Sequence, residues 1–160
     1  MQVYYPPLLL AIIGAGGIYT GCNPSYTGTE ISRHLKSTKS RFFISDVTLL
    51  SKIADNVLST DLPASNVFQF NHHGEDILPG FPSWRELQNH GEASWMTFSS
   101  QDEAKATTAA LLSTSGTSGL PKSAMHSHHN FIAQSIMIDD TVQKPYEVSG
   151  TIFDQHSITY

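Results

Sequence analysis

The hydrophobic and polar positions of this chain follow two periods, one typical of helices and one typical of strands. Apolar residues repeat at helical spacing over residues 49–58, and strand-like runs occupy residues 41–46 and 66–70. A capping-box pattern that starts at Thr27 predicts a further helix through residues 31–36. Helices and strands that alternate in this way predict an α/β fold with parallel strands.

The first apolar stretch predicts a short helix. Pro6 and Pro7 stand where the first turn of a helix accepts proline, and Gly16 and Gly17 follow as a C-cap. Because the residues between them are apolar on every side, we expect this helix to be buried on all sides. A short strand is expected next, at residues 18–21.

The second half of the chain has a weaker pattern. Glycines and prolines interrupt residues 71–107, so we expect a surface connection with one helical turn at residues 83–87. A strand is expected at residues 106–112 and an amphipathic helix at residues 129–138. Residues 141–160 show no clear element.

The composition mainly excludes classes of protein. The chain has 160 residues, the usual size of one domain, with 14% charged side chains and a net charge of −5. A negative chain does not attract nucleic-acid phosphates, so no nucleic-acid partner is expected. The single cysteine, Cys22, excludes an internal disulfide framework and a cysteine-based zinc cluster, and we interpret it as a buried thiol.

The sequence predicts neither a membrane span nor a secretion signal. The longest apolar run, residues 8–19, has 12 residues and three glycines, whereas a spanning helix needs about 20 residues. Residues 1–7 carry no Lys or Arg and so lack the charged leader of a signal peptide. We therefore expect an intracellular, cytoplasmic protein.

One segment, residues 113–123, carries a chemical signal. It combines hydroxyl side chains and two glycines with Lys122 near its end. Glycines let backbone N–H groups turn toward an oxyanion, hydroxyls add donors, and lysine supplies a positive charge. Lys122 is also the only Lys, Arg, Asp or Glu between residues 106 and 138. The pattern is typical of a polyphosphate-binding loop, although Gly/Ser-rich surface turns share its composition.

The Walker A loop is the first comparison for this segment. Gly116, Lys122 and Ser123 nearly match the pattern G-x-x-x-x-G-K-S/T. The match fails at Pro121, because proline has no N–H and a fixed φ, so the backbone cannot wrap a phosphate there in the same way. A Walker-type NTPase is therefore the weaker alternative.

The segment from Thr114 to Lys122 resembles the phosphate-binding signature of the adenylate-forming enzymes, which include acyl-CoA synthetases and 4-coumarate–CoA ligases. Pro121 is the residue that this signature has at its position, while Ser118 and Ser123 replace a usual Thr and a usual Gly. Residues 15–27 are similar to the family's segment that begins Ala-Gly-Gly and contains Asn-Pro. The order and separation of these motifs argue against a chance match.

The resemblance implies a function as well as a fold. Members of the family bind MgATP and a carboxylic acid, form an acyl-adenylate with release of pyrophosphate, and pass the acyl group to a thiol, often that of CoA. The loop would hold the β- and γ-phosphates. The residues expected to contact them are Thr114, Ser115, Gly116, Thr117, Ser118, Gly119 and Lys122. No catalytic residue and no metal ligand is expected among these 160 residues.

The family's remaining motifs are not recognised in residues 139–160. We therefore expect residues 1–160 to be part of the large N-terminal AMP-binding domain of an acyl-CoA ligase, a partial multi-layer α/β unit without the C-terminal domain. Alone, the chain is expected to be inactive and poorly soluble. The alternative is a non-catalytic remnant that at most binds nucleotide. The resemblance leaves a peroxisomal location open, although no targeting tripeptide ends this sequence.

Histidines and tryptophans provide weaker candidates for a site. His126, His128 and His129, together with His72 and His73, could suggest a metal site. No Asp or Glu stands at ligand spacing within residues 126–129, so metal binding is not expected. Trp84 and Trp95 could stack on a ligand, but we expect both to pack within the fold.

Overall fold

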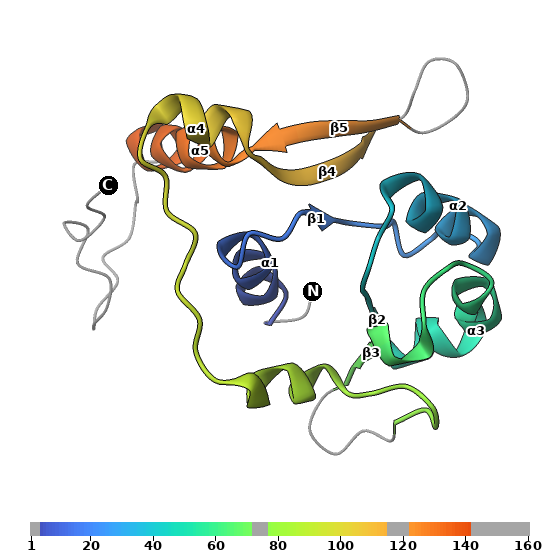
Figure 1. The fold of residues 1–160 in the computed structure, drawn as a ribbon. Coiled ribbons are helices and arrows are strands. Elements are labelled where there is room, and N and C mark those ends of the chain that lie inside the picture. Colours follow the sequence, from blue (N-terminus) through green and yellow to red (C-terminus); the bar gives the residue numbers. More distant parts are fainter. Residues whose placement is uncertain (1–3, 72–76, 115–121, 142–160) are drawn as a thin grey trace.

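The computed structural model describes residues 4–71, 77–114 and 122–141 (Figure 1). Helices and strands alternate through most of this chain, which confirms the predicted α/β class. In chain order the elements are α1 (Tyr5–Gly14), β1 (Tyr19–Thr20), α2 (Gly28–Thr38), β2 (Phe43–Asp46), α3 (Val47–Leu58), the 3-10 helix η1 (Ala64–Asn66), β3 (Val67–Phe70), the 3-10 helix η2 (Trp84–His90), α4 (Gln101–Ala106), β4 (Thr108–Thr114), β5 (Lys122–Ser127) and α5 (His128–Thr141).

The strands form two small sheets. In one, β2 pairs with β3 in parallel, with Phe43 opposite Val67. The other has the order β1-β4-β5, in which β1 and β4 are parallel while β4 and β5 are antiparallel. The prediction of parallel strands is therefore confirmed for the predicted strands, and the antiparallel pair involves β5, a strand that the sequence does not predict. The chain reverses its direction between β4 and β5, which is the connection that an antiparallel pair allows.

The helices α2 and α3 pack against each other over one core. Its buried side chains are Ile31, Leu35, Leu50, Ile53, Val57, Leu62 and Val67. The predicted capping box is present at the start of α2, where Thr27 Oγ1 accepts from the Glu30 N–H and the Glu30 carboxylate accepts from the Thr27 N–H. The carboxylate of Asp46 caps α3 by accepting from the Thr48 N–H. These caps fix where each helix begins.

Strand β3 is buried on both faces, since every one of its residues is buried. Val67 belongs to the core under α2 and α3. Phe68 and Phe70 lie with Trp84 of η2 in a second cluster, against which Leu8 of α1 packs. The rings of Phe70 and Trp84 stack with their centroids 4.6 Å apart, so Trp84 packs within the fold as predicted.

Helix α1 is less buried than its sequence predicts. Ile13 is buried, but Leu10 is 51% exposed. The expectation of burial on all sides is wrong for the described part of the chain, because several residues of α1, among them Tyr5 and Leu10, are exposed to solvent. Trp95 lies against Gly14 of α1, so closely that a Cβ atom added at Gly14 would collide with the indole ring. Trp95 is 63% exposed, so the prediction that it packs within the fold is wrong apart from this contact.

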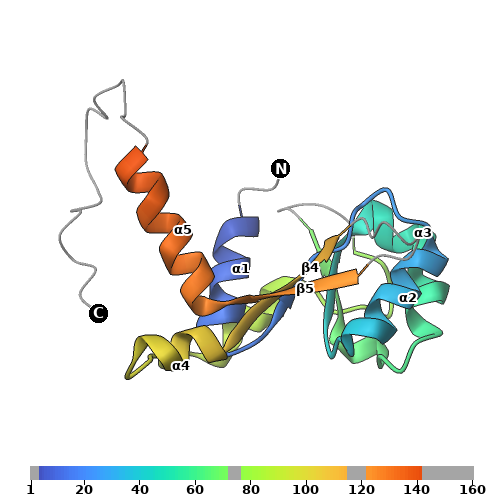
Figure 2. The ribbon, with the colours of Figure 1, turned by 90° about the horizontal axis from the view of Figure 1, so that it is seen from above.

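Three elements lie outside the sequence predictions: the one-turn η1, helix α4 and strand β5. The region expected as a surface connection contains α4, whose N-cap is Ser100, the hydroxyl of which accepts from the Glu103 N–H. Strand β5 was not expected, because its residues mix polar and apolar types without a clear alternation. Helices α4 and α5 pack together beside β5, and β4 and β5 extend from them toward α2 (Figures 1 and 2).

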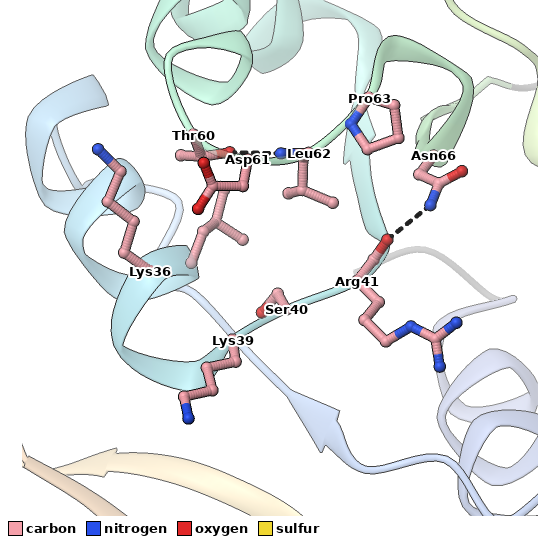
Figure 3. A pocket seen from close by; sticks show the side chains of 10 residues that line it. Lys36, Lys39, Ser40, Arg41, Thr60, Asp61, Leu62, Pro63 and Asn66 are labelled. Atoms are coloured by element: carbon pink, nitrogen blue, oxygen red, sulfur yellow. Dashed lines mark hydrogen bonds between the residues drawn. The ribbon is translucent and has the colours of Figure 1, made fainter.

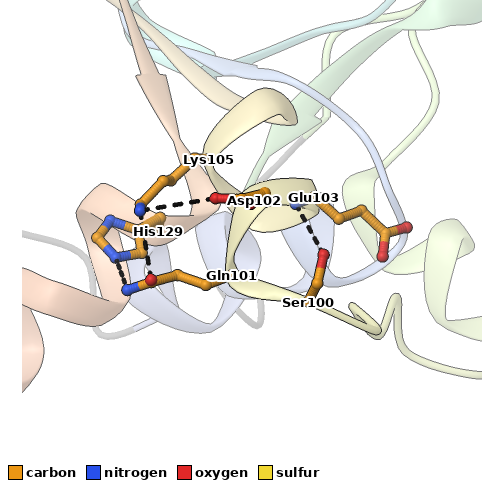
Figure 4. Close-up of polar contacts among 6 residues, drawn as sticks. All are labelled: Ser100, Gln101, Asp102, Glu103, Lys105 and His129. Carbon is orange, nitrogen blue, oxygen red and sulfur yellow. Dashed lines mark hydrogen bonds and ion pairs between the residues drawn. The ribbon is translucent and has the colours of Figure 1, made fainter.

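Polar contacts join α4 to the start of α5 (Figure 4). Nε2 of Gln101 lies 2.8 Å from Nε2 of His129, and Lys105 pairs with Asp102 at 3.8 Å within α4.

None of the helices in residues 4–71, 77–114 and 122–141 has the length and apolarity needed to cross a membrane.

Candidate phosphate-binding site

The candidate loop connects the end of β4 to the start of β5, at the carboxyl end of β4. Since β1 and β4 are parallel, their carboxyl ends lie at the same edge of the sheet. Ligands of open α/β sheets bind outside the carboxyl ends of the strands. The loop therefore starts from the edge at which such folds present their binding groups.

Two of the seven expected phosphate contacts, Thr114 and Lys122, belong to the described residues. They are opposite each other in the register of β4 and β5. Thr114 Oγ1 donates to the backbone O of Lys122 at 3.1 Å, so this hydroxyl closes the base of the loop. The other five, Ser115, Gly116, Thr117, Ser118 and Gly119, lie outside the described residues.

The side chain of Lys122 is exposed at the foot of the loop. Within the described residues it has no carboxylate partner, because the ion pair found there joins Lys105 to Asp102. A cation in this position can approach an anion bound by the loop without first breaking an ion pair.

A buried histidine of α2 lies next to the strands that carry the loop. His34 is 8% exposed. Its Nε2 lies 3.0 Å from Thr20 Oγ1 of β1, and its Nδ1 lies 3.4 Å from Ser113 Oγ of β4. Burial lowers the pKa of the His34 imidazole below its ordinary value, which favours the neutral ring.

The hydrogen bonds around His34 determine which ring nitrogen carries the proton. Thr20 Oγ1 donates its only proton to the backbone O of Leu111 at 3.0 Å, so toward the imidazole it acts as an acceptor. Nε2 of His34 is therefore the protonated nitrogen, and the lone pair of Nδ1 accepts from the Ser113 hydroxyl. The four groups form a directed chain from Ser113 through His34 and Thr20 to Leu111.

Sequence reasoning did not identify His34 as a site residue. The available signal was a histidine on the same helix face as Ile31 and Leu35, which predicts a polar group inside an apolar core. Its partner hydroxyls are 14 and 79 residues away in the sequence, so local spacing could not connect them.

A separate cavity of about 400 Å³ lies between the end of α2 and the segment that leads into β3 (Figure 3). Its charged lining residues are Lys36, Lys39, Arg41 and Asp61. The segments that line it precede β2 and β3, so the cavity is at the amino ends of these strands, away from the edge where ligands of α/β sheets bind.

The histidines considered as a candidate metal site make other contacts in the described part of the chain. No group of three His, Cys, Asp or Glu side chains suited to a metal ion occurs in the described part of the chain. The ring of His128 packs on Phe98 at 4.7 Å between centroids, and His129 contacts Gln101. His72 and His73 lie outside the described residues.

The thiol of Cys22 is half-buried. Burial raises the pKa of Cys22 to about 11, so the thiol stays protonated at neutral pH and is a poor nucleophile. The interpretation of Cys22 as a buried thiol is therefore right only in part, since the side chain is half-buried.

Comparison with protein families and curated proteins identifies relatives over nearly the whole chain. The model of a family described as AMP-binding enzyme matches residues 2–154. Phenylacetyl-CoA ligase epaB and acyl-CoA ligase azaF, both from Aspergillus niger, are 38% and 37% identical to it over 150 residues. Each match covers 92% of this chain and 28% of the relative, so the chain spans less than a third of these relatives' length.

Solved structures share the fold. A red-emitting luciferase from Phrixothrix hirtus matches with a TM-score of 0.73 and 19% identity, over 88% of this chain and 34% of the luciferase. ATP-bound MatB from Rhodopseudomonas palustris matches with a TM-score of 0.64 and 26% identity, over 88% of this chain and 25% of MatB. These matches confirm the resemblance that the motifs indicate.

Proposed function

The chain belongs to the AMP-binding enzyme family, and we propose on that basis that residues 114–122 bind the β- and γ-phosphates of MgATP as part of an acyl-CoA ligase. In the complete enzyme, the carboxylate would attack the α-phosphorus of ATP to form an acyl-adenylate and release pyrophosphate, and the thiol of CoA would then take the acyl group and release AMP. The names of the two Aspergillus niger relatives support a carboxylate–CoA ligase.

The observation that carries the proposal is the pairing of Thr114 with Lys122 at the carboxyl end of β4. The pairing brings the first and last of the expected phosphate contacts to one place, with five more expected contacts in the sequence between them. Both residues are held by a strand ladder, which fixes these two contacts relative to each other.

The charge distribution supports a local role for Lys122. The chain as a whole, with a net charge of −5, repels a nucleoside triphosphate, so binding requires cations close to the phosphates. Lys122 supplies one, and Mg²⁺ that enters with ATP as part of the substrate supplies more. Phosphoryl chemistry depends mainly on such positioning and charge neutralisation, and the residues of the loop would supply part of both.

The 160-residue chain, assayed by itself, is expected to bind ATP without adenylating an acid. The reason is chemical: large rate enhancements need the complete arrangement of groups around both reactants, and one phosphate loop supplies a fraction of it. Steady pyrophosphate exchange by the purified chain with aryl or fatty acids would contradict this part of the proposal.

Equilibrium titration of the chain with MgATP tests the proposed site. We expect saturable binding that Lys122→Ala weakens about tenfold or more, because a charge-assisted contact contributes about 1.5–3 kcal/mol. Lys105→Ala is the matched control, since it removes an exposed lysine that pairs with Asp102 away from the loop. Equal weakening by both variants would attribute the effect to overall charge and contradict the proposed site.

A further inference from the structure

The directed chain of hydrogen bonds through His34 has a consequence for the loop. We infer that His34 is a positioning residue, which holds Ser113 and thereby the β4 side of the loop in the geometry that binds phosphate. This inference rests on the proposed function, because it concerns the same loop.

The contact is built from three elements. His34 belongs to α2, Thr20 to β1, and Ser113 to β4. Both nitrogens of the ring are within hydrogen-bond range of a hydroxyl, at 3.0 Å and 3.4 Å. The imidazole therefore contacts both strands directly, and because the Thr20 hydroxyl donates to Leu111 of β4, it is linked to β4 a second time through Thr20.

Ser113 transmits this constraint to the loop. It is the residue immediately before Thr114, and it is opposite Ser123 in the register, next to the pair of Thr114 and Lys122. These two pairs are the last at the loop end of the hairpin. A bond that fixes Ser113 therefore restricts the first residue of the loop, whereas Ser123, on the opposite strand, is exposed.

The inference depends on one donor and one acceptor in the same side chain. A neutral imidazole has both, and so does the carboxamide of glutamine. Leucine fills a similar volume but offers neither. His34→Gln and His34→Leu therefore separate the hydrogen bonds of the residue from its packing between α2 and the strands.

The experiment measures MgATP binding by the 160-residue chain at pH 7.5 and compares four variants with the wild type. We expect His34→Leu and Ser113→Ala to bind about tenfold more weakly, as expected when a bond of about 1.4 kcal/mol no longer supports the bound geometry. His34→Gln should stay within about threefold of the wild type. Ser123→Ala, the serine opposite Ser113, should bind like the wild type.

Each of these measurements can overturn the role inferred for His34. Wild-type affinity in His34→Leu, or a loss in His34→Gln as large as in His34→Leu, would overturn the role of His34. Ser113 is only half-buried, so Ser113→Ala provides the answer even if His34→Leu does not fold, and wild-type affinity in Ser113→Ala would also overturn the inference. Failure of the wild type to bind MgATP would instead overturn the proposed function, and the role of His34 with it.

Discussion

Individual side chains determine how the fold around the loop responds to pH. His34 and His128 are both buried, and burial lowers the pKa of each imidazole below its ordinary value. The unfolded chain therefore binds protons at these positions more readily than the folded chain does. It follows that the stability they contribute is complete above the ordinary histidine pKa of about 6.5 and is lost as the pH falls through their lower folded values.

We predict that the urea midpoint of the chain decreases between pH 7.5 and pH 5, because acid favours the unfolded state in which these rings are charged. His34→Gln should reduce this decrease by removing one of the two rings. His90→Gln is the control, since His90 is exposed at the end of η2. A midpoint that rises toward pH 5 would contradict the assignment of His34 and His128 as buried neutral rings.

The elements show which features of the sequence determine local structure. Helix α2 has both hydrogen bonds of a capping box, and the pattern of Thr27 and Glu30 was sufficient to predict its start. A comparable Ser-x-x-Glu pattern begins α4 at Ser100, but that helix has 6 residues, too few to show a hydrophobic period. The cap pattern predicts α2, whereas the short α4, although it is also capped at its start, was not predicted.

Pairing between distant segments accounts for the elements that sequence did not predict. Strand β5 is defined by its partner β4, since its own residues do not alternate clearly. The candidate phosphate loop could be predicted from sequence because its residues are contiguous. The contact of His34 with Ser113 could not, because the chain separates them by 79 residues and only the fold joins α2 to β4.

The N-cap of α2 leads to a prediction about the stability of the fold. Thr27→Ala removes the hydroxyl that accepts from the Glu30 N–H, and we expect the free energy of unfolding to decrease by about 1 kcal/mol. Thr29→Ala, in the exposed first turn of the same helix, should leave it unchanged or slightly higher because alanine favours helices. Urea denaturation followed by circular dichroism measures both, and equal effects would contradict the importance of the cap.

At the scale of the whole molecule, the described residues expose many large apolar side chains to solvent. Large apolar side chains are exposed on the hairpin and on α5, among them Met125 at 75%, Ile132 at 42% and Ile136 at 47%. The sequence predicts an amphipathic face for the last helix, but the apolar and polar residues of α5 are not segregated to opposite faces, so the prediction is wrong in this respect. Exposed apolar patches promote association in water.

We therefore predict that the isolated chain self-associates as its concentration rises. Ile136→Lys should reduce association, because it replaces exposed apolar surface with a charge. Gln134→Lys adds the same charge to α5 without removing an apolar side chain, so it should reduce association less. Light scattering across a concentration series gives the answer, and a wild-type chain that stays monomeric throughout would contradict this prediction.

The central claim, that residues 114–122 bind the phosphates of ATP, is tested most directly by backbone-amide NMR of the labelled chain during titration with MgATP. We predict that the largest shift changes belong to residues 113–123, with smaller ones at His34 and Thr20, the groups hydrogen-bonded to the start of the loop. Changes confined to the cavity around Lys36 and Asp61, or no saturable changes in residues 113–123, would contradict the claim.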